Sequence, residues 1–315
     1  MSTAPPALEP DGFAEPPELS AGAAGGRGGR ARRRPLLLAT PAAAGMVVLL
    51  LAPVVTLLAY SILTAGLFTV SGPLTLDNYR DALESDLTWS LGKNALIVGL
   101  LVAAISVAIA IPVAYWLRYH AGRWQMFVLF LIAVSMFASY LVRIYAWRTI
   151  LGSHGILNSG LQEAGIIDRP SSLFIFNRAA IVIALVHIAV PYAVLVLFAG
   201  LRPLEPRYLE AARDLGGGAL QRWRRVVLPL IAGPAISVFI FTFVLASAEF
   251  VTPQFLGGAG DTMLGVQIQA QFTASGNWGV GAALAFLMLF VYGVCFAVSS
   301  LGLRLTGLNR IRWTT

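Results

Sequence analysis

The sequence has very few charged residues. Only 12% of its 315 residues are Asp, Glu, Lys or Arg, whereas 57% are hydrophobic. Soluble proteins carry roughly 25% charged residues. A soluble domain of this length needs a charged shell, and the long apolar segments leave no residues to build one. The composition therefore indicates a protein that is embedded in a lipid bilayer.

Residues that commonly carry chemistry are also scarce. Cys295 is the only cysteine, which excludes an intrachain disulfide and a cysteine-based zinc site. His120, His154 and His187 are scattered without the spacing of a metal-binding motif. The sequence contains neither a GxSxG turn nor a Walker-type phosphate loop. We therefore expect no catalytic residues, no cofactor and no metal, and any ATP that is consumed must be bound by another chain.

The net charge of +7 comes almost entirely from arginine, since Lys93 is the only lysine. Nucleic-acid binding is the usual first interpretation of a basic chain. Here the arginines fall in short clusters between apolar segments, which is how membrane proteins mark their cytoplasmic side. We therefore expect membrane lipid, and no nucleic acid, around the chain.

The predicted fold follows from the long apolar segments of the sequence. A helix needs about 20 apolar residues to cross the hydrocarbon core of a membrane. There are six such segments, at about residues 36–67, 95–117, 126–147, 179–201, 228–251 and 280–303. The first is too long for a cleaved signal peptide. The sequence thus predicts an all-α polytopic membrane protein with six transmembrane helices. Residues 35–315 form the membrane domain and residues 1–34, rich in Pro, Ala, Gly and Glu, form a disordered tail.

The positions of the basic residues set the predicted orientation. With the N-terminus inside, the cytoplasmic segments hold 16 of the 22 Lys and Arg residues and the opposite side holds six. Cytoplasmic loops of membrane proteins carry this excess. We therefore expect a multi-pass protein of the cell (inner) membrane with both termini in the cytoplasm.

Two loops are expected on the outer side. Residues 75–83 can form a short interfacial helix, for which a solvated connector and a contact with a partner are both open. Residues 149–178 contain several glycines among apolar residues. We expect this loop to pack against the helix bundle, because irregular backbone exposed to lipid would leave its amides unpaired.

The most informative segment is the cytoplasmic loop at about residues 202–229. Pro206 suits the first turn of a helix, and the glycines from Gly216 onward end it. A second helix over residues 219–227 would then lead into the fifth span. The first helix has a small-sided apolar face, formed by Tyr208, Ala211, Ala212 and Leu215. This face could enter a groove on another protein, or the helix could lie on the membrane surface, and the pattern alone leaves both open.

The spacing of this loop resembles the EAA loop of ABC importer permeases. Glu210-Ala211-Ala212 is followed after three residues by Gly216, and after nine more by Val226-Val227-Leu228-Pro229. Further segments resemble spermidine/putrescine-type permease subunits: 141–147, 155–158, 256–258, 263–265, 271–272, Trp278 and 281–283. The resemblance covers residues 75–305. Val226 stands where isoleucine is usual, and Gly279 where proline is common.

The resemblance implies a type I importer permease with the MetI-like fold, which forms half of a translocation pathway. In such systems the EAA helices dock into a cytoplasmic ATPase dimer, a second homologous permease subunit completes the pathway, and an extracytoplasmic binding protein delivers the substrate. A polyamine is the leading cargo, with iron, thiamine, phosphonate or opine-type solutes as alternatives. Carried over by position, the ATPase-coupling residues would be Tyr208, Glu210, Ala211, Ala212, Asp214, Gly216, Leu228 and Pro229.

Glu249 is an acidic residue near the outer end of the predicted fifth span. Ionisable groups inside a membrane are costly and usually functional. A cationic substrate such as a polyamine would suit it. The alternative is an ion pair with Arg143 or Arg148, which the topology places at similar depth.

Other residues within the predicted spans are weaker candidates for the substrate pathway. His187 precedes a proline in the fourth span, where core packing is the alternative. Tyr145 and Trp147 could stack on a cation, although aromatic residues at the end of a span often anchor the membrane interface. A self-sufficient secondary transporter would show paired ionisable residues or an internal repeat, and an enzyme a clustered catalytic set. The sequence shows neither.

Overall fold

The computed structural model describes residues 34–171 and 174–305. It divides into two units, Met1–Val54 and Val55–Thr315, which are treated separately. Helix α1 (Arg34–Ser61) crosses the boundary between them, and its part Ala44–Ser61 is long and apolar enough to cross a membrane. The predicted tail lies outside the described residues, apart from Arg34.

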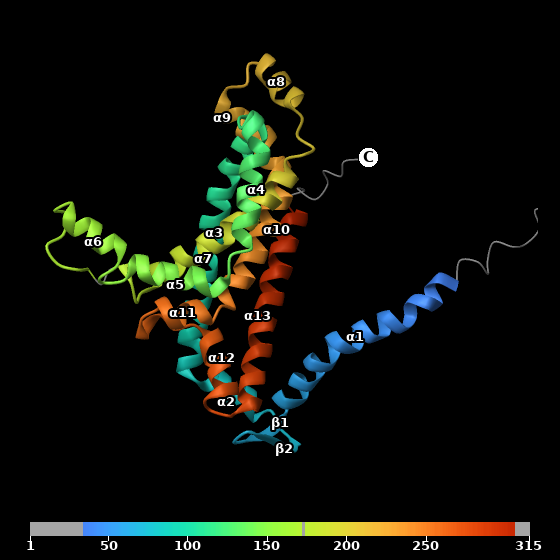
Figure 1. Cartoon of the computed structure of the whole chain (residues 1–315). Coiled ribbons are helices and arrows are strands. Elements are labelled where there is room, and N and C mark those ends of the chain that lie inside the picture. Colours follow the sequence, from blue (N-terminus) through green and yellow to red (C-terminus); the bar gives the residue numbers. More distant parts are fainter. Residues whose placement is uncertain (1–33, 172–173, 306–315) are drawn as a thin grey trace, which may run out of the picture. The chain divides into compact units, whose positions relative to one another are not determined.

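The second unit consists mainly of helices, which are labelled in Figure 1. After α1 the chain forms a hairpin and a succession of helices: β1 (Leu63–Gly66), β2 (Thr69–Leu74), α2 (Asp77–Glu84), α3 (Asp86–Tyr119), α4 (Gln125–Met136), α5 (Tyr140–Leu151), α6 (Ile156–Glu163), α7 (Arg178–Gly200), α8 (Pro206–Asp214), α9 (Ala219–Arg222), α10 (Leu228–Ser247), α11 (Val251–Leu256), α12 (Leu264–Thr273) and α13 (Trp278–Leu305).

Helices α3, α7 and α10 pack together as the core of this unit, and α4 packs on α7. Small side chains let their backbones approach closely, as is common between membrane helices. Ala110 and Ala114 of α3 and Ala193 of α7 are completely buried. Helices α8 and α9 lie at one end of this bundle, and α2 with the hairpin at the other (Figure 1).

Among the described residues, five helices are long and apolar enough to span a membrane, and the bent pair Gly122–Met136 and Tyr140–Glu163, which contains α4 and α5, is a sixth if it is counted as one span. The all-α fold with six predicted spans is therefore confirmed, but the third span is not the single helix expected over residues 126–147. Helices α4 and α5 meet at 94°. The bend falls at residues 137–139, which contain neither glycine nor proline.

Arg143 gives a physical reason for this bend. Its guanidinium donates a hydrogen bond of 2.9 Å to the carbonyl of Ala138, which a continuous helix would pair with a backbone amide. Ser139 is extended, with φ −55° and ψ 137°, and precedes α5. The side chain of Arg143, five residues after Ala138, thus replaces the backbone amide that would otherwise bond the Ala138 carbonyl.

Two further boundaries differ from the predicted spans. Helix α1 ends at Ser61, and residues up to 67 that were expected to continue it form β1 and the turn of an antiparallel hairpin, in which Ala65 pairs with Val70. Helix α10 ends at Ser247, and residues 248–250 are not helical before α11 begins. Glu249 therefore lies at a break between two helices rather than inside a span.

Both loops that were expected on the outer side contain short helices. Residues 77–84 form α2, whose Asn78 side chain donates to the carbonyls of Ser61 and Leu63 at 3.1 and 2.9 Å. This helix therefore docks on its own chain and is not a simple solvated connector. In residues 149–178 both ends pack in the core, through Leu151 and Ile175. The middle forms α6, which lies away from α3 and α10 (Figure 1), although its Leu157 packs against the same core cluster.

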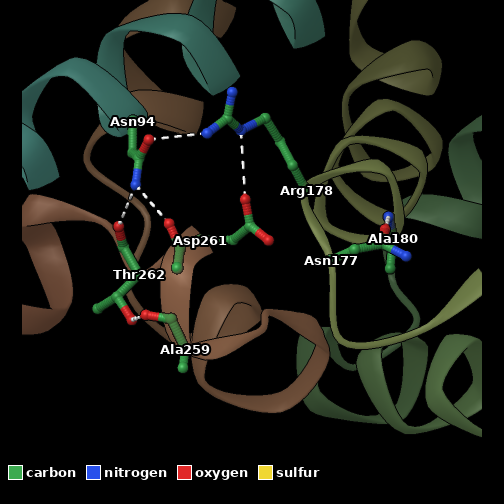
Figure 2. Close-up of polar contacts among 8 residues, drawn as sticks. Asn94, Asn177, Arg178, Ala180, Ala259, Asp261 and Thr262 are labelled. Atoms are coloured by element: carbon green, nitrogen blue, oxygen red, sulfur yellow. Dashed lines mark hydrogen bonds and ion pairs between the residues drawn. The ribbon is translucent and has the colours of Figure 1, made fainter. Parts of the chain in front are cut away.

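Asn94 of α3 joins three segments of the second unit, as Figure 2 shows. Its amide nitrogen donates to the carbonyls of Gly260 and Thr262 at 3.0 and 3.1 Å, and its oxygen accepts a 2.8 Å bond from Arg178. The Nε atom of Arg178, at the start of α7, lies 3.4 Å from a carboxylate oxygen of Asp261. A single amide thus holds α3, α7 and the 259–262 turn together.

Replacing Asn94 with alanine should destabilise the protein. Asn94 is only 9% exposed, and the change leaves two carbonyls and a guanidinium nitrogen without their partner. We expect the free energy of unfolding to fall by about 1–3 kcal/mol, measured as a lower thermal unfolding midpoint in detergent. Lys93→Ala, at the exposed neighbouring position, is the control. Equal midpoints for the two variants would contradict this role.

Candidate functional site

Helix α8 of the 202–229 loop begins and ends as its sequence predicts. Pro206 occupies its first turn, where a missing N–H is harmless. At its end Gly216 has φ +79°, the left-handed conformation that favours glycine. The amide of Gly217 donates to the carbonyl of Ala212, and that of Gly216 to Arg213, both at 2.9 Å. This paired arrangement is a Schellman motif, and it fixes the direction in which the chain leaves α8.

The predicted coupling residues of α8 point outward. None of the helix's residues is buried, and Leu215, directly after it, is 90% exposed. Exposed residues of the predicted set are Tyr208, Glu210, Ala211, Asp214 and Gly216, while Ala212 is half-buried. The apolar face of α8 is therefore presented to the surroundings of the chain rather than packed on its own bundle.

The segment after α8 is mechanically continuous with the fifth span. One helical run extends from Ala219 to Ser247, through a π-helical turn at Trp223–Val227. Pro229 has no N–H, and its ring collides with the carbonyl four residues earlier in a regular α-helix. A wider π turn directly before it, closed by the Leu228 amide and the Trp223 carbonyl, accommodates the ring. The loop is therefore joined to α10 without an intervening break in the helical run.

Aromatic residues anchor the loop to α3. The hydroxyl of Tyr119 donates a 2.7 Å hydrogen bond to the carbonyl of Leu204, which lies just before α8. The ring centroid of Tyr115 lies 4.8 Å from that of Tyr119 and 4.7 Å from that of Trp223, which follows α8. Both sides of the loop are thus fixed to one helix end. Sequence reasoning missed these residues, although two tyrosines spaced by four on a helix share a face.

Glu249 acts as the N-terminal cap of α11. One carboxylate oxygen accepts from the amides of Phe250 and Val251, at 3.0 and 2.7 Å, and more weakly from Thr252 at 3.4 Å. The other oxygen accepts from the hydroxyl of Tyr140 at 2.5 Å. Tyr140 is the first residue of α5, so this bond joins the break before α5 to the break before α11.

The ion pair considered from the sequence is not formed. Within the described residues, no ion pair joins Glu249 to Arg143 or Arg148. Arg143 donates to the carbonyl of Ala138 instead, and the free amides of α11 satisfy the carboxylate. The alternative of an ion pair with Arg143 or Arg148 is therefore wrong, because both helices are broken where continuous helices were expected.

The remaining pathway candidates lie around α5. The Trp147 ring contacts that of His187 edge to face at 5.5 Å between centroids, and Tyr145 contacts Phe255 in the same way at 5.2 Å. His187 is exposed, so it is not packed in the core. The structure thus brings Trp147 and His187 together but does not group them with Glu249.

Comparisons with known sequences agree with one another. The family described as binding-protein-dependent transport system inner membrane component matches residues 106–305. The spermidine/putrescine transport system permease protein PotB of Haemophilus influenzae is 32% identical over 76% of this chain and 86% of its own length. PotB of Escherichia coli is 31% identical over 71% and 81%. The inner membrane ABC transporter permease protein YdcU of Escherichia coli is 30% identical over 78% and 82%.

Solved structures show the same fold. A chain of a bacterial ABC transporter involved in the import of the acidic polysaccharide alginate has a TM-score of 0.71 and 18% identity, covering 90% of this chain and 98% of its own. A chain of the MetNI methionine ABC transporter has a TM-score of 0.53 and 17% identity, covering 70% and 98%. At such low identity these matches establish the architecture and leave the cargo open.

Gly216→Ala should loosen the end of α8. A Cβ atom there meets no neighbour, so the cost arises from the positive φ alone. This cost is about 1–2 kcal/mol, and we expect the Gly217 amide to exchange hydrogen about tenfold faster. Gly218→Ala is the matched control, because Gly218 also has free space but a φ of −63°. Equal exchange in both variants would show that the turn does not depend on glycine.

Proposed function

Because the chain belongs to the family of binding-protein-dependent transport system inner membrane components, we propose that it is a permease subunit of an ABC importer for polyamines such as spermidine and putrescine. The observation that carries the proposal is identity of 30–32% to PotB permeases over most of the chain. The chain is a multi-pass protein of the inner membrane and a transport subunit, not an enzyme.

The chain works with the usual components of an ABC importer, and we propose specific partners for it. An ATPase dimer would receive α8, a second homologous permease subunit would complete the pathway, and an extracytoplasmic binding protein would deliver the polyamine. The outward apolar face of α8 supports the first assignment. The excess of arginine on the α8 side supports cytoplasmic termini, with residues 35–315 as the permease domain.

Coupling would proceed through the loop as a lever. Closure of the ATPase dimer displaces α8, and the Schellman turn at Gly216 transmits this displacement because it fixes the angle to α9. The helical run from Ala219 to Ser247 then carries it into α10, which packs on α3 and α7. Tyr119 and Trp223 keep the loop against α3. Glu210, Ala211, Ala212 and Asp214 would form the docking surface, and Leu228 and Pro229 the start of the moving span.

Glu210→Lys should uncouple transport. The side chain is exposed, so insertion and folding should be unchanged, whereas reversed charge in a docked interface costs binding energy. In proteoliposomes holding the complete importer, we expect ATP-driven spermidine uptake to fall by more than about tenfold, with less ATPase retained on the purified permease. Glu163→Lys, a charge reversal at an exposed position of α6, is the control. Equal uptake by the two variants would refute the docking role.

The cargo is tested with wild-type protein. Uptake of labelled spermidine and putrescine should require ATP and the binding protein, and excess unlabelled polyamine should suppress it. Iron(III), thiamine, a phosphonate and an opine should not compete. If one of these solutes is taken up with ATP and polyamines are not, the chain is an importer permease but the polyamine assignment is excluded. If this chain takes up polyamine without an ATPase, the ABC importer mechanism is excluded.

A further inference from the structure

A cavity of about 430 Å³ lies beside the break that contains Glu249. Its walls come from α3, α4, α5, α7 and α10. Pockets of roughly 300–1,000 Å³ are typical of small-molecule sites. Most of the lining is aliphatic, and the residues that can recognise a ligand are Tyr140, Tyr192, Phe241, Thr242 and Glu249.

Glu249 supplies a negative charge and forms no ion pair with a cation in the described part of the chain. Its hydrogen-bond donors are three backbone amides and the hydroxyl of Tyr140, all of them formally neutral. Arg143, the nearest arginine along α5, is bonded to the carbonyl of Ala138 and does not line the cavity. A carboxylate in an apolar cavity is costly and attracts a positive charge.

Thr242 provides an independent indication of a ligand. It is only 2% exposed, and its hydroxyl has no hydrogen-bond partner among the described residues. Buried hydroxyls in helices usually bond to a carbonyl one turn earlier, and leaving one unpaired costs free energy. Thr242 is one of the residues that line the same cavity as Glu249, and an ammonium N–H that reaches its hydroxyl could donate to it.

Aromatic rings form a further part of the wall. The centroids of Tyr192 and Phe241 lie 4.6 Å apart with an interplanar angle of 37°, and the two residues come from α7 and α10. Aromatic faces attract ammonium groups, most strongly where water is excluded. The pair therefore suits a cation with alkyl segments better than an anion, which Glu249 would repel, or a sugar, which needs many hydrogen bonds.

We propose that this cavity binds an ammonium group of the polyamine on its way through the membrane, with charge from Glu249, cation–π contacts from Tyr192 and Phe241, and an acceptor from Thr242. The inference rests on the proposed polyamine function. It places the substrate pathway at residues other than most of those expected from the sequence. Tyr145, Trp147 and His187, the aromatic candidates from the sequence, do not line the cavity, and of the five predicted residues Glu249 alone does so.

Two substitutions separate ligand binding from structural support. Glu249→Gln removes the charge but keeps an oxygen that can accept from the amides of α11. Thr242→Val keeps the shape of the side chain and removes only the unpaired hydroxyl. A structural role for Thr242 predicts that valine lowers stability, whereas the proposed role predicts unchanged or higher stability together with weaker binding.

The experiment is equilibrium binding of labelled spermidine to the purified complete importer in detergent, without the binding protein. We expect the Kd to rise about tenfold for Glu249→Gln and about threefold for Thr242→Val, with the thermal unfolding midpoint of Thr242→Val equal to or above that of wild type. Glu163→Gln, an exposed carboxylate of α6, should leave the Kd unchanged. Putrescine should compete, and 1,4-butanediol, which has the same carbon chain without the charges, should not.

Failure of the inference is distinguishable from failure of the proposed function. If the wild-type importer transports spermidine but Glu249→Gln and Thr242→Val bind it as well as wild type, the cavity is not the site and the polyamine function stands. Equal competition by 1,4-butanediol would likewise overturn a cation site. If the wild-type importer transports no polyamine even with its binding protein, the proposed function itself falls.

Discussion

The structure depends on the rule that every backbone amide and carbonyl inside a membrane needs a partner from the protein. Long helices meet this requirement by themselves, and two breaks meet it with side chains. Arg143 bonds the free carbonyl of Ala138 at the first break, and Glu249 bonds the free amides of α11 at the second. Tyr140 then joins the two breaks through Glu249. Charged residues that look anomalous in apolar segments thus make irregular backbone possible there.

Helix α10 connects the two functional regions of the chain. It begins at the π turn, where Trp223 packs on Tyr115, and it ends at the break with Glu249. Thr242 and Phe241 lie on the same helix, whereas Tyr192 lies on α7. A movement of α8 that shifts α10 against α7 therefore changes the walls of the cavity directly. Linkage requires the reverse as well, so a cation bound at the proposed site between α7 and α10 would bias the position of the loop.

The sequence predicts those parts of the fold that follow from local physics. Hydropathy locates the spans, and Pro206 and Gly216 delimit α8 because each restricts its own backbone. The bend at residues 137–139 gave no such signal, since it depends on the side chain of Arg143 reaching a carbonyl. The cap formed by Glu249 was missed for a related reason, because a carboxylate inside an apolar run has the same sequence pattern whether it pairs with a cation or with amides.

The segments that resemble polyamine permeases do not line the cavity, and one of them, at residues 263–265, lies against the break that contains Glu249. Leu256, the last residue of α11, and Met263, directly before α12, are completely buried. Gly265 lies against the second break, where a Cβ atom would come within 2.9 Å of the Glu249 carbonyl, so a larger residue would displace the cap. These segments therefore specify the geometry of the break. In the proposed site, recognition of the cargo would fall to residues outside these segments, such as Thr242, so that the frame could persist while the cavity is changed.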